Sequence, residues 1–167
     1  ESRAISLVRV IKKATTFDRG KAYIVMNLDT NGLDFLVIRN GHLYFDYFNS
    51  WRALEAEDRQ ISLEGFRAVI VRSLRQVVNF YSARWKDPIE NIFLSTPSLG
   101  TEIQDVVKKA FSLEVRELRL NITDIPGNDW AVALGAGLRG LTSRREDREI
   151  SLLPVSASEE FRREETL

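Results

Sequence analysis

Two Asn-Gly pairs, each between runs of strand-forming residues, restrict the fold more than any other feature of this sequence. The pairs are Asn31-Gly32 and Asn40-Gly41. Asn-Gly suits the left-handed backbone of a tight hairpin turn. Residues 22–51 are therefore predicted to form a three-stranded antiparallel meander. Its strands are the β-branched and aromatic runs Tyr23–Leu28, Leu33–Ile38 and Leu43–Phe48.

Apolar residues at spacings of three and four predict a long helix after the meander. Ser62 is expected to cap its start. Asp87-Pro88 is expected to end it, because proline disfavours helical geometry in the preceding residue. A shorter helix over residues 4–14 is predicted before the meander. The expected buried stripe of the long helix is Leu63, Phe66, Ile70, Leu74, Val77 and Tyr81.

The rest of the sequence predicts two more strands and two more helices. The helix between the strands has Thr101 and Gln104 at the spacing of a capping box. The last helix is expected to start at Asn128 as N-cap and to cover residues 130–141. Its glycines and alanines predict close approach of another backbone, because glycine otherwise weakens a helix by about 1 kcal/mol. The strands are Asn91–Ser95 and Val115–Leu120, the second of them at an edge.

This order of elements predicts an α/β fold. Three antiparallel strands followed by two strands reached through helices give a mixed five-stranded sheet with helices on its faces. Right-handed crossovers place Asp29–Gly32 and Pro97–Gly100 at the same end of that sheet, where ligands bind in open α/β folds.

Composition excludes several kinds of site. With 24 Lys and Arg against 24 Asp and Glu, the chain of 167 residues has no net charge to attract nucleic acid. It has no cysteine and a single histidine, His42, which argues against disulfides, zinc sites and histidine triads. No apolar run approaches the roughly 20 residues of a membrane span. Because the sequence opens on Glu1, we expect it to be part of a longer protein.

The order of elements resembles the ribonuclease H-like half that occurs twice in actin-like ATPases. Over residues 4–140 the chain is similar to the second domain of the PilM family of type IV pilus assembly proteins. The resemblance implies a cytoplasmic actin-like domain, residues 1–141, at the bacterial inner membrane, paired with a first domain of the same fold. It rests on the segments Asn27–Asp34, Leu36–Leu43, Leu74–Tyr81, Phe93–Ser95 and Trp130–Gly140.

Residues 142–167 form a charged linker and tail around one short apolar segment. From the residues alone, the segment is either a docking peptide or a last strand packed on the domain. It is similar to the Ile-Asn-Leu-Leu-Pro signature of the PilN family, the membrane-anchored partners of PilM. The resemblance implies a PilM and PilN fusion, as in the L component of type II secretion, with PilN- and PilO-like partners and possible self-association. The segment consists of Ile150, Ser151, Leu152, Leu153 and Pro154.

Two loops would bind nucleotide if the actin-like site is kept. The resemblance implies ATP with magnesium as the cofactor of the intact two-domain protein, with magnesium held by Asp29 through water. Asp-Thr-Asn-Gly also suits a hairpin turn that binds nothing, and Pro97 and Leu99 stand where the family has glycine. The loop residues are Asp29, Thr30, Asn31, Gly32, Ser95, Pro97, Ser98 and Gly100.

Three functions follow from these observations. The first is a non-enzymatic scaffold that binds partner proteins, and the second is the ATP-binding half of an actin-like ATPase. The third is a metal-dependent nuclease, which needs carboxylates clustered at the strand ends. No acidic residue lies near Phe93–Ser95, and no basic stripe supports nucleic-acid binding. We favour the scaffold.

Overall fold

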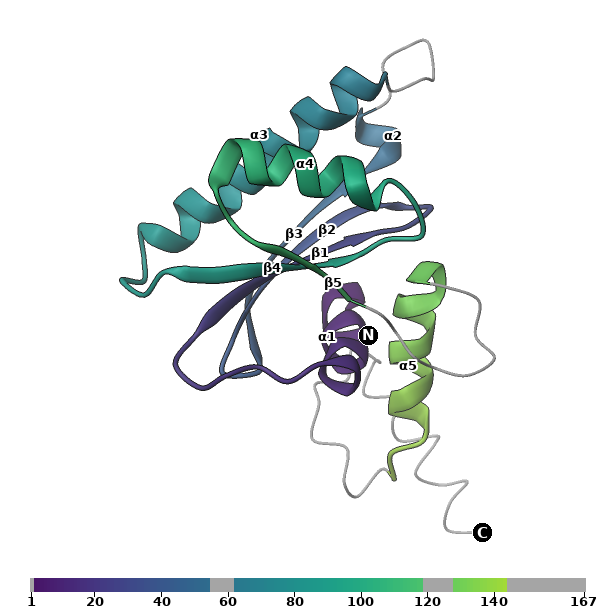
Figure 1. The fold of residues 1–167 in the computed structure, drawn as a ribbon. Helices are drawn as coiled ribbons and strands as arrows, with labels where there is room; N and C mark the ends of the chain where they lie inside the picture. The colour runs from purple at the N-terminus through teal and green to yellow at the C-terminus, as the bar shows by residue number, and fades with distance from the viewer. Residues whose placement is uncertain (1, 55–61, 119–127, 144–167) are drawn as a thin grey trace, which may run out of the picture.

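The computed structural model describes residues 2–54, 62–118 and 128–143 and shows a five-stranded sheet in the order β3-β2-β1-β4-β5 (Figure 1). β1 pairs antiparallel with β2, and β2 pairs antiparallel with β3. β1 also pairs in parallel with β4, and β4 with β5. The predicted α/β fold, with a mixed sheet whose first three strands are antiparallel, is confirmed. The strands are β1 (Ala22–Leu28), β2 (Gly32–Arg39), β3 (His42–Ser50), β4 (Ile89–Ser95) and β5 (Val115–Glu117).

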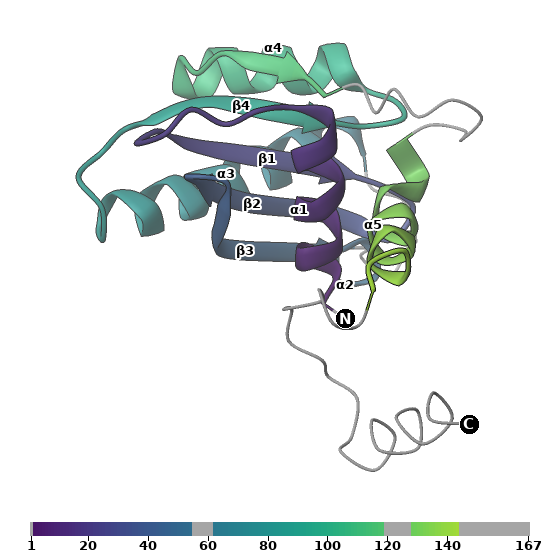
Figure 2. The ribbon, with the colours of Figure 1, turned by 90° about the horizontal axis from the view of Figure 1, so that it is seen from below.

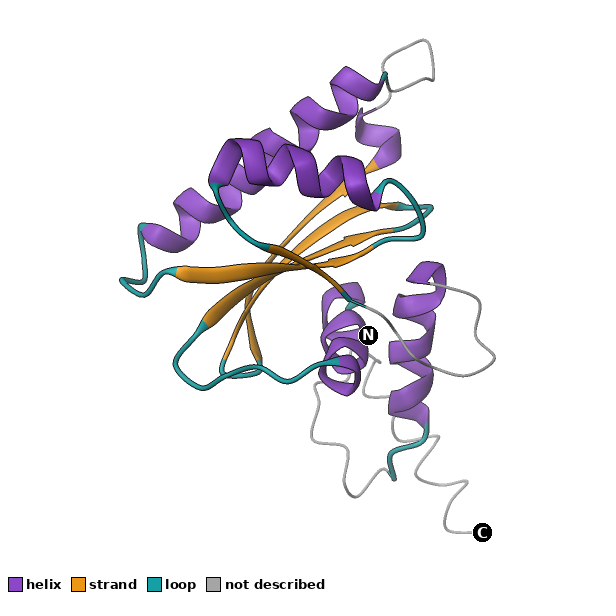
Figure 3. Ribbon diagram, viewed as in Figure 1, coloured by secondary structure: helices purple, strands orange, loops and turns teal. Residues whose placement is uncertain are grey.

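Helices cover both faces of the sheet. α3 and α4 lie on one face, and α1 and α5 lie on the other (Figures 2 and 3). The central strand β1 is buried along its whole length and divides the apolar core into two layers. Ile24 and Met26 point into the layer beneath α3 and α4, whereas Tyr23 and Val25 point into the layer beneath α1 and α5. The helices are α1 (Arg3–Ala14), α2 (Trp51–Leu54), α3 (Leu63–Ser82), α4 (Gly100–Phe111), the 3₁₀ helix η1 (Asn128–Trp130) and α5 (Ala131–Gly140).

Helix α3 largely agrees with its sequence pattern. The hydroxyl of Ser62 accepts a hydrogen bond of 3.0 Å from the backbone N–H of Gly65, so the predicted cap is confirmed. Leu63 was expected in the buried stripe but is 48% exposed, because the first turn of α3 extends past the sheet core. The helix ends at Ser82, before the Asp87-Pro88 stop that the sequence predicts.

The starts of α4 and α5 differ from the predictions. α4 begins at Gly100 with Leu99 in the N-cap position, so the predicted capping box of Thr101 and Gln104 is wrong. Asn128 lies inside η1 and is not the N-cap of α5, a position that Trp130 holds. Neither Leu99 nor Trp130 caps its helix through a side-chain hydrogen bond. Local cap signals therefore did not locate the starts of these two helices.

Close approach of α5 to α1 explains one of its glycines. A Cβ atom on Gly135 would lie 2.0 Å from the backbone oxygen of Ser6. The carbonyl oxygen of Gly135 also accepts a hydrogen bond of 2.6 Å from Arg9 Nη1. Gly137 and Gly140 have open space around the same position. The predicted close approach is confirmed at Gly135 only.

Several predictions fall on residues that the structure does not describe. All residues after 143, the segment Ile150–Pro154 among them, lie outside the described residues, as do residues 55–61 and 119–127. The last strand is therefore seen only as Val115–Glu117, at the sheet edge as expected. In the parts of the chain that are described, no helix combines the length and apolar character of a membrane-crossing segment.

Candidate functional site

The Asp29–Gly32 turn that joins β1 to β2 is held by the side chain of its first residue. Asp29 Oδ1 accepts hydrogen bonds from the backbone N–H groups of Asn31, at 2.8 Å, and of Gly32, at 3.3 Å. The backbone N–H of Asp29 donates to the carbonyl oxygen of Gly32 at 3.1 Å. This arrangement is typical of an Asx turn, in which an aspartate stabilises the backbone that follows it. Two backbone donors of the turn therefore point at Asp29 rather than at a ligand.

Arg3 of α1 engages the other oxygen of Asp29. Its Nη2 donates to Asp29 Oδ2 at 2.5 Å. Its Nε and Nη2 also donate to the two oxygens of Asp34 on β2, both at 2.8 Å, in the fork geometry of arginine and carboxylate pairs. Asn27 on β1 donates a further hydrogen bond of 3.0 Å to Asp34. The Asp29 and Asp34 side chains are only 3% and 4% exposed, so Arg3 neutralises charge in a buried place.

The electrostatics of this cluster follow from its geometry. Burial alone would lower the pKa of Arg3, but the hydrogen bonds to Asp34 and Asp29 outweigh burial and raise that pKa above its ordinary value. The guanidinium also lies 4.9 Å from the ring centre of Phe48, within cation–π distance. Arg3 is thus a fixed positive charge directly beneath the hairpin turn.

A magnesium ion at Asp29 fits these residues poorly. Asp29 Oδ2 is in contact with the guanidinium of Arg3, and Oδ1 accepts hydrogen bonds from the turn. A cation placed there would meet like charge at close range. Within the described residues, no group of three or more His, Cys, Asp or Glu side chains is arranged to hold a metal ion.

The second loop, between β4 and α4, has a bulky residue in a strained conformation. Leu99 has φ 61° and ψ 20°, the left-handed region that leucine rarely adopts. A non-glycine residue held there costs on the order of 1–2 kcal/mol. Thr96 and Ser98 stabilise the loop, since the Thr96 hydroxyl donates to the Ser98 carbonyl and accepts from the Ser98 N–H. The loop therefore has an exposed leucine at a backbone position that would suit glycine better.

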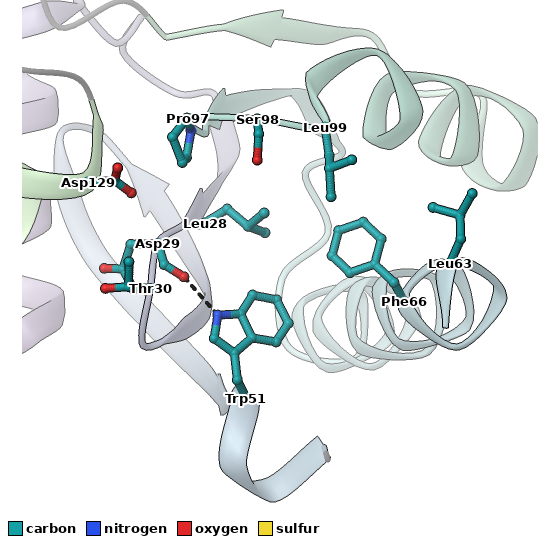
Figure 4. A pocket seen from close by; sticks show the side chains of 10 residues that line it. All are labelled: Leu28, Asp29, Thr30, Trp51, Leu63, Phe66, Pro97, Ser98, Leu99 and Asp129. Atoms are coloured by element: carbon teal, nitrogen blue, oxygen red, sulfur yellow. Dashed lines mark hydrogen bonds between the residues drawn. The ribbon is translucent and has the colours of Figure 1, made fainter. Parts of the chain in front are cut away.

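A pocket lies between the two loops, at the same end of the sheet (Figure 4). Its volume is about 660 Å³, within the range of roughly 300–1,000 Å³ that ligand pockets have. Trp51 forms part of one side, and its indole N–H donates to the Asp29 carbonyl at 2.7 Å (Figure 4). The lining residues are Leu28, Asp29, Thr30, Trp51, Leu63, Phe66, Pro97, Ser98, Leu99 and Asp129.

The structure brings together half of the residues that the sequence proposed for nucleotide binding. Asp29 and Thr30 from the first loop line the pocket together with Pro97 and Ser98 from the second. The other four residues do not line it: Asn31, Gly32, Ser95 and Gly100.

Packing within the fold accounts for one of those four residues, Gly32. A Cβ on Gly32 would lie 2.1 Å from the backbone oxygen of Asn49, so this glycine is required by packing against β3. Ser95 is 2% exposed and lies opposite Asn27 in the register of β4 and β1. Among the described residues the buried hydroxyl of Ser95 has no hydrogen-bond partner, so packing accounts for Gly32 and not for the choice of serine at 95.

The apolar walls of the pocket were not among the predicted site residues. These walls come from three separate parts of the chain. They are Trp51 in α2, Leu63 and Phe66 in α3, and Leu99 at the N-cap position of α4. Leu63 and Leu99 are 48% and 39% exposed. The sequence did contain a signal for Leu63. It is the first apolar residue of the α3 stripe, one turn before the buried Phe66, and the end of such a stripe is where an apolar side chain can be exposed. Nothing in the sequence placed Trp51 beside them.

Comparison with known proteins supports the fold. No protein-family model matches the sequence, and no curated protein sequence matches it. Its structure is similar to one chain of the solved "PilM-PilN type IV pilus biogenesis complex", with a TM-score of 0.55 and 12% sequence identity over 84% of this chain. The chain spans about half, 51%, of that protein's length. It thus has the fold of one half of an actin-like protein.

Two further solved structures are similar at lower scores. The ethanolamine utilization protein EutJ from Carboxydothermus hydrogenoformans matches with a TM-score of 0.48 and 13% identity, over 82% of this chain and 53% of EutJ. The Alp12 filament structure matches with a TM-score of 0.46 and 10% identity, over 80% of this chain and 50% of that chain.

Proposed function

We propose that this chain is a non-enzymatic scaffold domain that binds partner proteins in the cytoplasmic inner-membrane platform of a type IV pilus or type II secretion machine. The observation that carries the proposal is the chemistry of the pocket. Asp29, the residue best placed to meet phosphate and magnesium, has both carboxylate oxygens engaged by the turn and by Arg3. The opposite wall presents the side chain of Leu99. Such a pocket suits apolar protein side chains better than a polyphosphate.

The fold similarity supports the choice of machine. The solved structure that matches with a TM-score of 0.55 is a complex of PilM with PilN in type IV pilus biogenesis. By analogy, the partners are PilN- and PilO-like platform proteins together with a first actin-like domain. The segment Ile150–Pro154 acts as an extended apolar peptide, anchored by Leu152 and Leu153, with main-chain hydrogen bonds fixing its register.

A second candidate function is favoured by one observation. The two loops meet at one end of the sheet with a pocket between them, which is where ligands bind in open α/β folds. The alternative is therefore that the chain is the ATP-binding half of an actin-like ATPase and acts only when paired with a first domain. The two candidates differ in whether this pocket binds nucleotide.

An amide NMR titration with magnesium ATP separates the two. The scaffold predicts no shift at Thr30, Gly32, Ser98 or Gly100 at millimolar ATP. Saturable shifts at both loops would contradict it and favour the nucleotide half-site. A Leu99→Gly variant is the matched comparison, because glycine accepts the positive φ and removes the bulk from the pocket wall. Binding that appears only in this variant would assign the lack of affinity to Leu99.

Partner binding needs a direct measurement as well. The chain is titrated with purified cytoplasmic segments of the PilN- and PilO-like proteins of the same organism, with isothermal calorimetry as the readout. Saturable binding of at least one segment is expected. Heat changes no larger than those of dilution, for both segments, would overturn the proposed scaffold role.

A further inference from the structure

The pocket between the two loops leaves apolar surface uncovered. Of its apolar lining residues, Leu63 and Leu99 are exposed, Trp51 is half-buried and Phe66 is buried (Figure 4). Leu99 lines the pocket although glycine would suit its positive φ better. Exposed apolar side chains gathered around a cavity are typical of a docking site.

The chain itself contains a segment of matching chemistry. Ile150, Leu152 and Leu153 lie between charged stretches and form an isolated apolar run. Pro154 ends the run and favours an extended backbone in the residue before it. An extended peptide of this kind buries two or three side chains in a pocket and little else, which suits an open cavity of about 660 Å³.

The length of the chain brings this segment within reach. Asp129, just before α5, lines the pocket, and α5 leads away from it over ten residues, or about 15 Å. The chain from Gly140 to Ile150, extended at about 3.3 Å per residue, spans about 33 Å. It can therefore return along the whole of α5 to the pocket of the same molecule.

We propose that Ile150–Pro154 docks in the pocket between the Asp29–Gly32 and Pro97–Gly100 loops of its own chain, with Leu152 and Leu153 against Trp51, Leu63 and Leu99. The inference rests on the proposed function, since the pocket must be free of nucleotide. It adds to the proposed scaffold function that the pocket binds a segment of its own chain. A partner that binds the same segment would have to compete with the pocket, so docking would regulate when the peptide is offered.

A spin label tests this contact in the full chain. The sequence has no cysteine, so Ser151→Cys can be labelled with a nitroxide at one position and keeps both leucines. Paramagnetic broadening is expected at the methyl groups of Leu28, Leu63 and Leu99. Ile38, at the opposite end of β2 from the pocket, is expected to stay sharp. Broadening confined to other surfaces, or spread evenly over the molecule, would overturn the proposal.

Three variants show whether the contact is specific. Leu152→Asp/Leu153→Asp is expected to abolish the broadening, whereas the matched change Ser156→Asp/Ser158→Asp in the same tail is expected to leave it unchanged. Leu99→Gly is expected to weaken the broadening while the melting temperature stays the same or rises. Equal broadening in all variants would contradict docking through the two leucines.

A mixing experiment distinguishes docking in one chain from docking between chains. Spin-labelled chains are mixed with isotope-labelled chains that carry no nitroxide. Docking within one molecule predicts no broadening in the mixture, and broadening there would overturn the intramolecular contact. ATP-dependent shifts of Gly32 and Gly100 would instead refute the proposed function, so the two failures are distinguishable.

Discussion

At the scale of single residues, Arg3 is the side chain on which the end of the sheet depends. It joins helix α1 to Asp29 and Asp34, two carboxylates that are almost fully buried. Arginine suits this position because its fork can donate to both carboxylates at once, which a lysine cannot do in the same geometry. The same contact that orders the hairpin turn also takes Asp29 out of use as a phosphate or metal contact.

Replacing Arg3 should therefore cost much more than replacing an exposed cation of the same helix. Arg3→Met leaves Asp29 and Asp34 buried without their counter-charge, and the expected loss in the free energy of unfolding is about 3 kcal/mol. Lys13→Met, at an exposed position of α1, is expected to change it by no more than about 0.5 kcal/mol. Urea unfolding measures both. Equal stability of the two variants would show that the buried pair is not stabilising.

The candidate site could be predicted from the sequence only in part, for reasons visible at individual residues. Asp29 and Pro97 were placed at one end of the sheet because strand order and crossover handedness fix where loops emerge. Arg3 could not be placed there, because its contacts lie 26 and 31 residues away along the chain. The left-handed Leu99 was equally hidden, since its conformation is set by packing and opposes its own preference.

At the scale of elements, runs of β-branched and aromatic residues between turn residues located the first three strands, which extend one to three residues beyond the predicted runs. Asn40-Gly41 has the predicted left-handed backbone, with φ 53° and 72°. The prediction was wrong for Asn31-Gly32, where neither residue has a positive φ and Gly32 already begins β2.

Helix interiors followed from apolar spacing, and the start of α3 at its Ser62 cap was also correct, but the starts of α4 and α5 were not. α4 and α5 have Leu99 and Trp130 at their N-cap positions and begin without a side-chain cap. The predicted capping box therefore identified a real helix and placed its start wrongly.

The contact between α1 and α5 predicts opposite effects of one substitution at two glycines. In Gly135→Ala the new methyl would lie 2.0 Å from the Ser6 oxygen, so the helices must separate, with an expected loss of about 2 kcal/mol. In Gly137→Ala the methyl meets nothing within 4 Å. The better helix propensity of alanine should then stabilise the protein by up to about 1 kcal/mol. Thermal unfolding compares the two variants, and a loss of stability in Gly137→Ala would contradict the packing described here.

At the scale of the whole molecule, the two apolar layers share a single strand. β1 lies between its neighbours β2 and β4 and contributes side chains to both layers. Every residue of β1 is buried. Loss of packing in either layer would therefore expose β1, which also packs in the other layer. Arg3 of α1 also binds Asp29 of the hairpin turn. Asp29 and Thr30 of this turn line the pocket, together with Leu63 and Phe66 of α3. The pocket thus depends on helices on both sides of the sheet.

This coupling predicts that a substitution that loosens packing on one face of the sheet lowers the stability of the helices on both faces equally. Gly135→Ala disturbs only the contact of α5 with α1, yet native-state hydrogen exchange should show the same loss of protection for the slowest amides of α1 and of α3. The reason is that single domains of this size usually unfold as one cooperative unit, so both helices exchange through global unfolding. A loss confined to α1 and α5 would mean that they open as a separate unit. In that case the Arg3 contact with Asp29 would break without unfolding of the sheet, and the hairpin turn would become available to ligands.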